Sequence, residues 1–531
     1  MEILTEVILA IVAIIFLHSL RCFLLSSGKP WNWPLVGTLP MAFLHFHRIY
    51  DKITECLQAG NGVFLFKGVW FTGTDRLITT NPANVHRIMS ANFSNYPKGP
   101  ESKRIFDVFG DMLFNSDHDE WKCHRKITHS FLNDQRLHNY TPKINQHILE
   151  KGLIPVLEHV SKQGLEVDLQ DVFERLMLDA TCMMLTGYDP GSLRCGFEEV
   201  AFSRAMDDAS YTIFLRHILP ERFWKLQKWL GIGQEKIMTS ACTTLDNIAH
   251  NYVEMKQEQL RISKDNEQEF DALRCFLTED EAIGSTKHPY SVMRDTVVGL
   301  MFAGRDTTGA ALTWLFWLLS QNPLAESKIR EEMEAKLSWV DATDCWSCDT
   351  GELSKLVYLH GAICESLRLY PPVPFQIRTT VQPDMLPSGH RVNSNSKIVL
   401  SSYAMGRMKS IWGEDCLEFK PERWVSEKGG MRIEPSNKFL AFSSGPRICP
   451  GKELAFIRMK AVVAAILHYY NVQVLPRRSL EVDLEDVFQR LLLDVTCMML
   501  TGSDQEIHEG SLSRTIDDAS LTRSFGSYKS G

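Results

Sequence analysis

The sequence lacks the features that mark several large classes of protein. Its 531 residues carry a net charge of −8, so it has no excess of basic residues for a nucleic-acid-binding surface. Neither a G-x-G-x-x-G nor a G-x-x-x-x-G-K-[ST] pattern occurs, which removes the simplest dinucleotide-binding and P-loop interpretations. No Ser/Gly-rich linker divides the chain, so we expect one large body and not several domains.

The cysteines are too few and too scattered to form a disulfide framework. Thirteen cysteines in so long a chain suit a reducing compartment, where most serve as small buried apolar residues. Cys345 and Cys348 form one C-x-x-C, but no second pair completes a metal site. We interpret that stretch as a loop.

A long apolar run opens the chain, ILTEVILAIVAIIFLHSLRCFLL at residues 3–25. As a helix it is long enough to cross a hydrocarbon core of about 30 Å. Acidic Glu2 and Glu6 lie at its start and Lys29 lies beyond its end, so the positive-inside rule places the main body in the cytosol. The run is too long, and its start too acidic, for a cleaved signal peptide. We therefore expect residues 1–29 to be a single-pass membrane anchor.

The pattern after the anchor is mainly helical. Apolar residues from Leu165 onward recur at three- and four-residue spacing, and Gly187 marks a stop. A longer helical run extends from about Ser291 to Asn322 and ends at Pro323. Strand-like stretches are short: VFLFKG near Val63, KIVLSSYA near Lys397 and NVQVL near Asn471. These patterns predict a mainly α fold.

One cysteine, Cys449, lies in a special setting, FSSGPRICPGKELAF from Phe442. Gly445 and Gly451 permit a sharp turn and a close approach of backbone to a flat ligand. Arg447 supplies a nearby cation, and an apolar helix begins just after the cysteine, so its N-terminus favours a thiolate. A deprotonated sulfur with donors and an apolar shield is what an iron–thiolate bond needs. A merely structural cysteine leaves this setting unexplained.

The pattern F-x-x-G-x-R-x-C-x-G resembles the haem-thiolate signature of the cytochrome P450 superfamily. The resemblance covers roughly residues 33–475 and implies the P450 fold, a large helical domain with small β-sheets behind the membrane anchor. It implies haem b (iron protoporphyrin IX) as cofactor and Cys449 as the metal ligand. The other signature residues would bind the cofactor: Phe442, Gly445, Arg447 and Gly451.

The long helical run carries a second family motif, MFAGRDTTGAALTW. It matches A-G-x-D-T-T, which implies that Asp306 relays protons to dioxygen and that Thr307 assists at the same step. Glycine in a helix interior costs about 1 kcal/mol relative to alanine. The resemblance explains Gly304 as a small residue against which dioxygen and substrate fit.

Two further motifs agree with the family. In ESLR, Glu365 and Arg368 share a helix face, and the resemblance adds Arg423 from FKPERW to form a buried structural network. In WKCHR, the resemblance implies that Trp121 and Arg125 reach a haem propionate, with Arg378 as a further partner. It also places three residues against the substrate: Val373, Pro374 and Phe375.

The implied reaction is a monooxygenation with dioxygen and two electrons. No flavin or nicotinamide domain is visible, so the resemblance implies electrons from a separate NADPH-dependent cytochrome P450 reductase, on the cytosolic face of the endoplasmic reticulum membrane. AGRDTTGAALTWLFWLLSQNP and LVYLHGAICESLRLYPPVPF resemble the plant clan that hydroxylates fatty acyl chains. YAMGRMKSIWGEDCLEFKPERW resembles its mid-chain alkane hydroxylases. A small apolar substrate, an alkane or fatty acid, is therefore expected.

Three alternatives remain open. The chain could act on another apolar plant metabolite, because a few pocket residues decide specificity. It could rearrange hydroperoxides without dioxygen, although such relatives typically lack the Asp306–Thr307 pair. It could also bind haem without turnover, and the reason lies at the C-terminus.

The C-terminal tail, residues 476–531, partly duplicates residues 165–210. LEVDLEDVFQRLLLDVTCMMLTG from Leu480 differs at four positions from LEVDLQDVFERLMLDATCMMLTG at Leu165, and SRTIDDAS at Ser513 echoes SRAMDDAS at Ser203. The second copy stands where the family has a closing β-hairpin. We expect the first copy to pack as an amphipathic helix and the second to find no equivalent slot. Two copies do not make a solenoid, which favours recombination between related genes or a faulty gene model.

Overall fold

The computed structural model describes residues 32–33, 35–45, 48–69, 73–262, 271–275, 289–337, 350–473 and 522–523. The expected membrane anchor, the C-x-x-C at Cys345 and nearly all of the duplicated tail lie outside these described residues. Within them, none of the helices combines the length and the apolar character that a membrane span requires.

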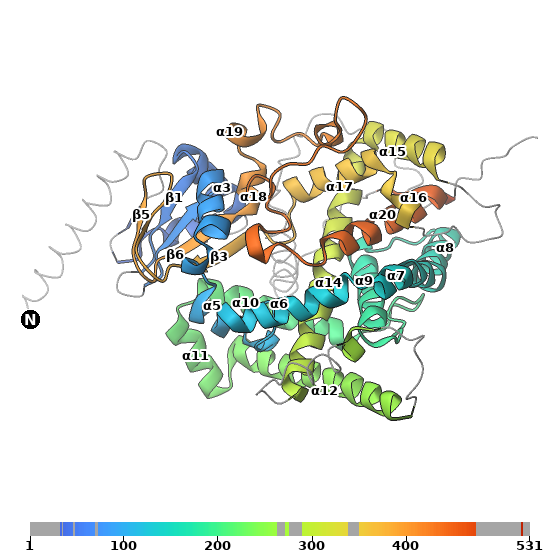
Figure 1. The fold of residues 1–531 in the computed structure, drawn as a ribbon, viewed down its shortest axis with the longest axis horizontal. Coiled ribbons are helices and arrows are strands. Elements are labelled where there is room, and N and C mark those ends of the chain that lie inside the picture. Colours follow the sequence, from blue (N-terminus) through green and yellow to red (C-terminus); the bar gives the residue numbers. More distant parts are fainter. Residues whose placement is uncertain are drawn as a thin grey trace, which may run out of the picture.

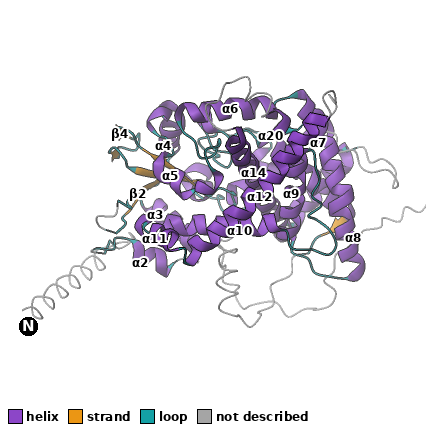
Figure 2. Cartoon of the chain, turned by 90° about the horizontal axis from the view of Figure 1, so that it is seen from below, coloured by secondary structure: helices purple, strands orange, loops and turns teal. Residues whose placement is uncertain are grey.

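Helices make up most of the described chain and the strands of the main sheet gather at one end (Figure 1; Figure 2), which confirms the mainly α prediction. The helices are α2 (Leu39–Leu44), α3 (Ile49–Ala59), α4 (Pro82–His86), α5 (Gly99–Ile105), α6 (His118–Leu132), α7 (Gln135–Ile148), α8 (Ile154–Gln163), α9 (Leu169–Thr186), α10 (Ala201–Ile218), α11 (Glu221–Leu230), α12 (Gly233–Ile262), α14 (Pro289–Gln321), α15 (Pro323–Lys336), α16 (Thr350–Ser354), α17 (Val357–Leu369), α18 (Ser402–Gly406), α19 (Lys409–Trp412) and α20 (Lys452–Tyr469).

The strands form small sheets, as expected. The strands are β1 (Val63–Phe66), β2 (Arg76–Thr79), β3 (Phe375–Thr379), β4 (Asp384–Met385), β5 (Arg391–Val392), β6 (Lys397–Ser401), β7 (Tyr470–Asn471) and β8 (Thr522–Arg523). The main sheet has the order β1-β2-β6-β3, in which β2 and β6 are parallel and the other neighbours antiparallel. The expected strand near Lys397 ends at Ser401, whose hydroxyl accepts the Ala404 N–H and starts α18.

Helix α14 confirms the predicted long helix almost to the residue. It crosses the centre of the molecule (Figure 1) and stops before Pro323, which opens α15. Its residues share one core cluster with α9 and α20, so α14 is a central element against which the site is assembled.

Helix α9, the first copy of the duplicated segment, is more deeply buried than its pattern predicted. Asp168 caps its start by accepting the Gln170 N–H at 2.8 Å, and Gly187 ends it with a φ of +77°. Every residue from Arg175 to Thr186 is buried, including the polar ones. The amphipathic expectation is therefore wrong for this part: neighbouring elements cover the helix on all sides. Arg175 is buried at tolerable cost because it donates to the carbonyls of Ser192 and Glu198.

Candidate functional site

The motif cysteine lies in a tight loop before α20. A short 3-10 turn, η7 (Gly445–Arg447), precedes it, and the Cys449 N–H donates to the Phe442 carbonyl at 2.8 Å. Gly445 has a φ of +64°, and a Cβ there would lie 1.9 Å from the carbonyl oxygen of Met89. Glycine at this position is thus required both by backbone conformation and by the adjoining chain.

Opposing influences act on the pKa of the Cys449 thiol. Burial is the largest influence and raises the pKa of the thiol, while a hydrogen bond from the Gly451 N–H and the charges of Arg125 and Lys452 lower it. Arg447, expected to supply the cation, instead donates to Asp117 Oδ1 at 2.5 Å. Burial thus opposes the thiolate, whereas the Gly451 N–H and the two cations favour it, and a thiol loses its proton when it binds a metal ion.

Helix α6 brings the predicted Trp121 and Arg125 to this loop. Arg125 Nη1 donates to the carbonyl oxygen of Ile448, directly before the cysteine, at 2.6 Å. Trp121 is buried, and its ring centroid lies 4.8 Å from the guanidinium carbon of Arg447. The W-x-x-x-R spacing thus places both side chains on the α6 face toward the loop.

Three cations and one carboxylate lie near the loop: Arg378 is buried, and Lys98, Arg447 and Asp117 are half-buried. Arg447 pairs with Asp117, and Arg378 donates only to the Ile377 carbonyl among the described residues. Burial and the charge of Arg447 lower the pKa of Arg378 to about 9. Burial, with Arg447 and Arg378, also holds the pKa of Lys98 well below its ordinary value. Three cations thus share one carboxylate, and the excess positive charge is suited to bind an anionic ligand.

These residues fit a haem. The Nε atoms of Arg378 and Arg447 are buried donors with no hydrogen-bond partner in the described part of the chain, and carboxylates are the natural acceptors for them. The cationic group adjoins the cysteine loop, because Arg447 lies two residues before Cys449 and Arg125 donates to the carbonyl of Ile448. Lys98 was missed by the sequence analysis, because nothing in its local sequence, YPKGPES, distinguishes it from a surface lysine.

The middle of α14 borders open space. Ala303 is exposed although its helix crosses the centre of the molecule, and Thr307 Oγ1 donates to the Ala303 carbonyl at 2.7 Å. A hydroxyl that bonds back to the preceding turn relaxes the helix locally. The residue before Ala303, Phe302, packs on Phe109 with ring centroids 4.6 Å apart.

Gly304 serves a different purpose from the expected one. A Cβ at this position would lie 2.4 Å from Thr181 Oγ1 of α9, so the glycine faces α9. Gly309 repeats the contact one turn and a half later, where a Cβ would lie 3.1 Å from Glu174 Cγ. The glycines let two buried helices approach closely, and the interpretation of Gly304 as space for dioxygen and substrate is corrected.

Asp306 is tied to its neighbour Arg305. The Arg305 guanidinium, 3% exposed, lies 2.6 Å from Asp306 Oδ1, 2.6 Å from Glu174 Oε2 and 3.0 Å from Asp207 Oδ1. Burial raises the pKa of Asp306, and Arg305 opposes that shift. Glu174 and Asp207 were not predicted from the sequence.

The structure brings Glu365, Arg368 and Arg423 together. Arg368 donates to both carboxylate oxygens of Glu365 at 2.8 and 2.7 Å, and both side chains are fully buried. Arg423 Nε lies 3.3 Å from Glu365 Oε1, and Trp424 Nε1 donates to Oε2 at 2.8 Å. Every member of this buried network is paired, as buried charges must be.

The three expected substrate residues do not share one environment. Val373 is 40% exposed, whereas the Phe375 ring lies 5.0 Å from the ring of Tyr50 in the cluster around α3. Pro374 accepts the Tyr403 N–H through its carbonyl. Val373 is thus the exposed member of the three, and Pro374 and Phe375 are half-buried.

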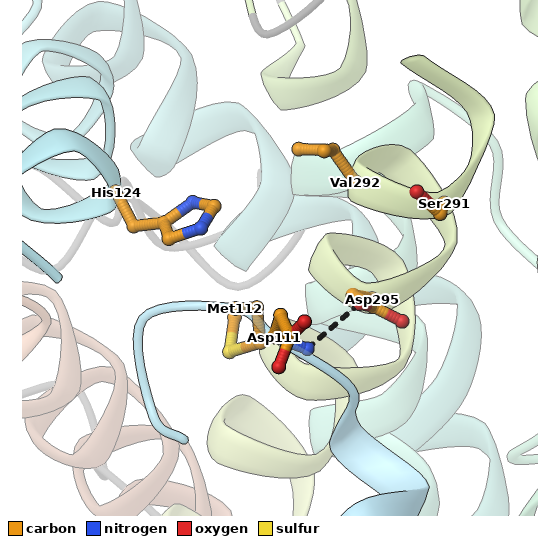
Figure 3. Close-up of a pocket in the computed structure, with 6 residues that line it drawn as sticks. All are labelled: Asp111, Met112, His124, Ser291, Val292 and Asp295. Carbon is orange, nitrogen blue, oxygen red and sulfur yellow. Dashed lines mark hydrogen bonds between the residues drawn. The ribbon is translucent and has the colours of Figure 1, made fainter. Parts of the chain in front are cut away.

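A cavity of about 80 Å³ lies at the start of α14 (Figure 3). Its lining residues are Asp111, Met112, His124, Ser291, Val292 and Asp295. Figure 3 shows His124 pointing into it from α6, and the Asp111 N–H donates to Asp295 Oδ2 at 2.8 Å. A ligand pocket usually has several hundred cubic ångströms, so this cavity is too small for a long aliphatic chain. Among the described residues no group of three metal-ligating side chains forms a metal site.

Comparison with known proteins gives concordant matches. The family profile described as Cytochrome P450 matches residues 27–500. The chain is 42% identical to the alkane hydroxylase MAH1 of Arabidopsis thaliana, over 88% of this chain and 94% of that one. It is 37% identical to noroxomaritidine synthase 1 of Narcissus pseudonarcissus, over 90% and 92%. A crystal structure of a cytochrome P450 (CYP102L1) superposes with a TM-score of 0.67 at 20% identity, over 82% and 94%, which shows a shared fold.

Proposed function

The chain belongs to the cytochrome P450 family and is a haem-thiolate monooxygenase, and we propose that its substrate is a long-chain aliphatic molecule, an alkane or a fatty acid. The observation that carries this proposal is the 42% identity to an alkane hydroxylase over 88% of the chain. The motifs that resemble the plant fatty-acyl and alkane hydroxylases support it from the sequence.

We assign the haem to the described group of residues. Cys449 would ligate the iron, and Lys98, Arg378 and Arg447 would pair with the propionates, with Trp121 and Arg125 of α6 alongside. When bound, the haem supplies the activation of dioxygen and the insertion of one oxygen atom, so that RH, O2, two electrons and two protons give ROH and water. The chain supplies the ligand, the orientation and the protons.

In this proposal, side chains in the middle of α14 deliver the protons. The Asp306 carboxyl, held by Arg305, carries a proton toward the space beside Ala303. The Thr307 hydroxyl is oriented by its bond to the Ala303 carbonyl and presents its own lone pairs to that space. General acid catalysis of this kind contributes about 10²–10⁴-fold.

Apolar walls support an aliphatic substrate. Phe302 of α14 packs on Phe109, and the Phe114 ring lies 5.7 Å from that of Phe109 in an edge-on arrangement. Phe106 extends the group, with centroids 5.1 Å from Phe114. Phe302 and Phe109 offer apolar contact next to Ala303 in the chain, whereas Lys98 lies over the Phe114 ring and His217 packs on Phe106. The apolar Phe302–Phe109 contact suits an aliphatic chain.

The family implies an electron-donating reductase and dioxygen as partners. We propose that the reductase is NADPH-dependent and bound to the same membrane. Residues 1–29 anchor this chain to the endoplasmic reticulum membrane, with the catalytic body in the cytosol. The apolar run at residues 3–25 supports this placement.

A second candidate is the oxidation of a different apolar plant metabolite. The 37% identity to noroxomaritidine synthase 1, over 90% of the chain, favours it. Relatives at similar identity thus carry unlike names, so family membership alone leaves the substrate open.

The test starts with haem ligation and proceeds to turnover. We expect the reduced, carbon monoxide-bound protein to show the Soret band of thiolate ligation, and Cys449→Ser to lose it. The protein with reductase and NADPH should then hydroxylate members of an alkane and fatty-acid series, at a rate that depends on chain length.

Two outcomes would refute parts of the proposal. A Soret band only at the position of the denatured protein would refute the monooxygenase activity of this chain. Normal ligation with no product from either aliphatic series, but product from an alkaloid precursor, would replace the first candidate with the second.

A further inference from the structure

Arg305 forms ion pairs with three carboxylates that come from three different helices in the interior. Asp306 is its neighbour on α14, Glu174 comes from α9 and Asp207 from α10, at 2.6, 2.6 and 3.0 Å from guanidinium nitrogens. Arg305 is 3% exposed, Glu174 17% and Asp306 25%. One buried cation therefore faces three acids.

The charges do not balance if all three acids are ionised. Burial, aided by the charges of Asp306 and Asp207 and opposed by Arg305, raises the pKa of Glu174 to about 7. Burial likewise raises the pKa of Asp207 to about 6, with Arg305 opposing and Asp306 assisting. Like charges that share a buried site cannot all ionise, so the group holds a proton close to neutral pH.

The surroundings of the group add little positive charge. On α9, the Gln170 amide donates to Glu174 Oε1 at 2.9 Å. On α10, Asp208 adds negative charge near Asp207, and the Arg204 cation acts on Asp208. Asp207 is the most accessible acid of the three, at 33% exposed. The group thus has a side open to solvent and a side on the α14 motif.

We propose that Asp207 and Glu174 form a proton store for Asp306, in which Asp207 takes a proton from solvent and passes it to the Asp306 carboxylate. Arg305 Nη1 lies within bonding distance of Oδ1 of both Asp207 and Asp306, so the two oxygens lie within reach of each other directly or across one water. An O–H bond breaks at Asp207 and one forms at Asp306. A hydronium ion from solvent then restores Asp207. The Glu174 carboxylate adds negative charge beside Arg305. This extra negative charge favours the protonated form of one of the acids, so the group retains its proton.

This inference rests on the proposed function, but its first test needs no turnover. A carboxyl whose pKa is higher in the folded state than in the unfolded state makes the protein less stable as the pH rises. The free energy of unfolding falls between the unfolded-state pKa and the folded-state pKa. Glu174→Gln in the haem-loaded protein removes that loss. The difference in melting temperature, variant minus wild type, should therefore become more positive as the pH rises from about 5 to about 7.5.

An ordinary ion pair predicts the opposite sign. If Glu174 only paired with Arg305 as a carboxylate, its removal would be more damaging at the higher pH, because the pair is then fully formed. Asp171→Asn, which removes a carboxylate of the Arg175 pair on the same helix, is the matched control and should show no such increase. A decreasing difference for Glu174→Gln would overturn the proton store.

The second test measures product formation with the best substrate. At about pH 7.5, Glu174→Gln and Asp207→Asn should lower kcat at least about tenfold with KM unchanged and enlarge the solvent deuterium isotope effect. Asp207→Glu should restore most of the rate, and Asp171→Asn should behave as wild type. Unchanged kcat and isotope effect in both variants would overturn the inference.

The two proposals fail in distinguishable ways. If the wild type yields no product, the proposed function fails, and the sign of the pH-dependent stability difference still decides whether the group stores a proton. If the wild type is active and the variants keep their carbon monoxide spectrum but not their rate, both proposals are supported.

Discussion

Gly304→Ala separates two explanations for a glycine in the middle of the central helix. A Cβ there would lie 2.4 Å from Oγ1 and 2.9 Å from Cγ2 of Thr181. Overpacking of this kind costs about 1–3 kcal/mol, whereas alanine gains about 1 kcal/mol in intrinsic helix preference. The net effect in the wild-type background should be a loss of about 0–2 kcal/mol in the free energy of unfolding.

The decisive measurement is the same substitution in a Thr181→Ala background. With both interfering atoms removed, the nearest remaining atom is the Cβ of residue 181 at 3.2 Å, so Gly304→Ala should lose most of its packing cost and range from neutral to stabilising by about 1 kcal/mol. Denaturant unfolding of the four haem-loaded proteins gives the coupling between the two positions, expected at about 1–3 kcal/mol. A coupling near zero, accompanied by lower product formation in both Gly304→Ala proteins, would refute the packing explanation and return the glycine to a role toward dioxygen.

Three further predictions concern the rest of the site. Glu365→Gln should lower the free energy of unfolding by about 3–5 kcal/mol, because it leaves Arg368 buried without its charge partner; denaturant unfolding measures this, and a loss below about 1 kcal/mol would contradict a buried network. Gly445→Ala should prevent haem loading, seen as absence of the Soret band in folded protein, since the φ of +64° and the Met89 carbonyl both exclude a Cβ. Arg378→Met should stabilise the haem-free protein and speed haem loss to apomyoglobin. Because burial holds the pKa of Arg378 at about 9, the stability of haem-free wild type should also rise as the pH increases through that value, and a flat profile would argue against it.

The sequence predicted the features that depend on residues close together in the chain. The long helix ended where Pro323 prescribes, α9 stopped at Gly187, and the first strand appeared at Val63. The cysteine loop could be located because glycine positions and the spacing of Cys449 are short-range properties. Periodicity, helix breakers and motif spacing act within a few residues and survive without knowledge of the fold.

The missed features depend on residues brought together from afar. Glu174 and Asp207 meet Arg305 across three helices, and their own segments look like ordinary amphipathic helix. Lys98 becomes part of a cationic group only after the chain places Arg378 and Arg447 beside it. Burial, a tertiary property, also raises the pKa of the Cys449 thiol, an influence that the local donors oppose and that the motif alone does not reveal.

The pairing of Glu174 with Arg305 makes the two copies of the duplicated segment worth comparing at this position. The second version has Glu485 where the first has Gln170, and Gln489 where the first has Glu174. Placed where α9 lies, it would carry its acid four residues earlier, about 6 Å along the helix axis from the position of Glu174. The second copy thus carries glutamine at the position that Glu174→Gln changes, and a chimera that exchanges the two copies tests whether the rate of product formation changes with it.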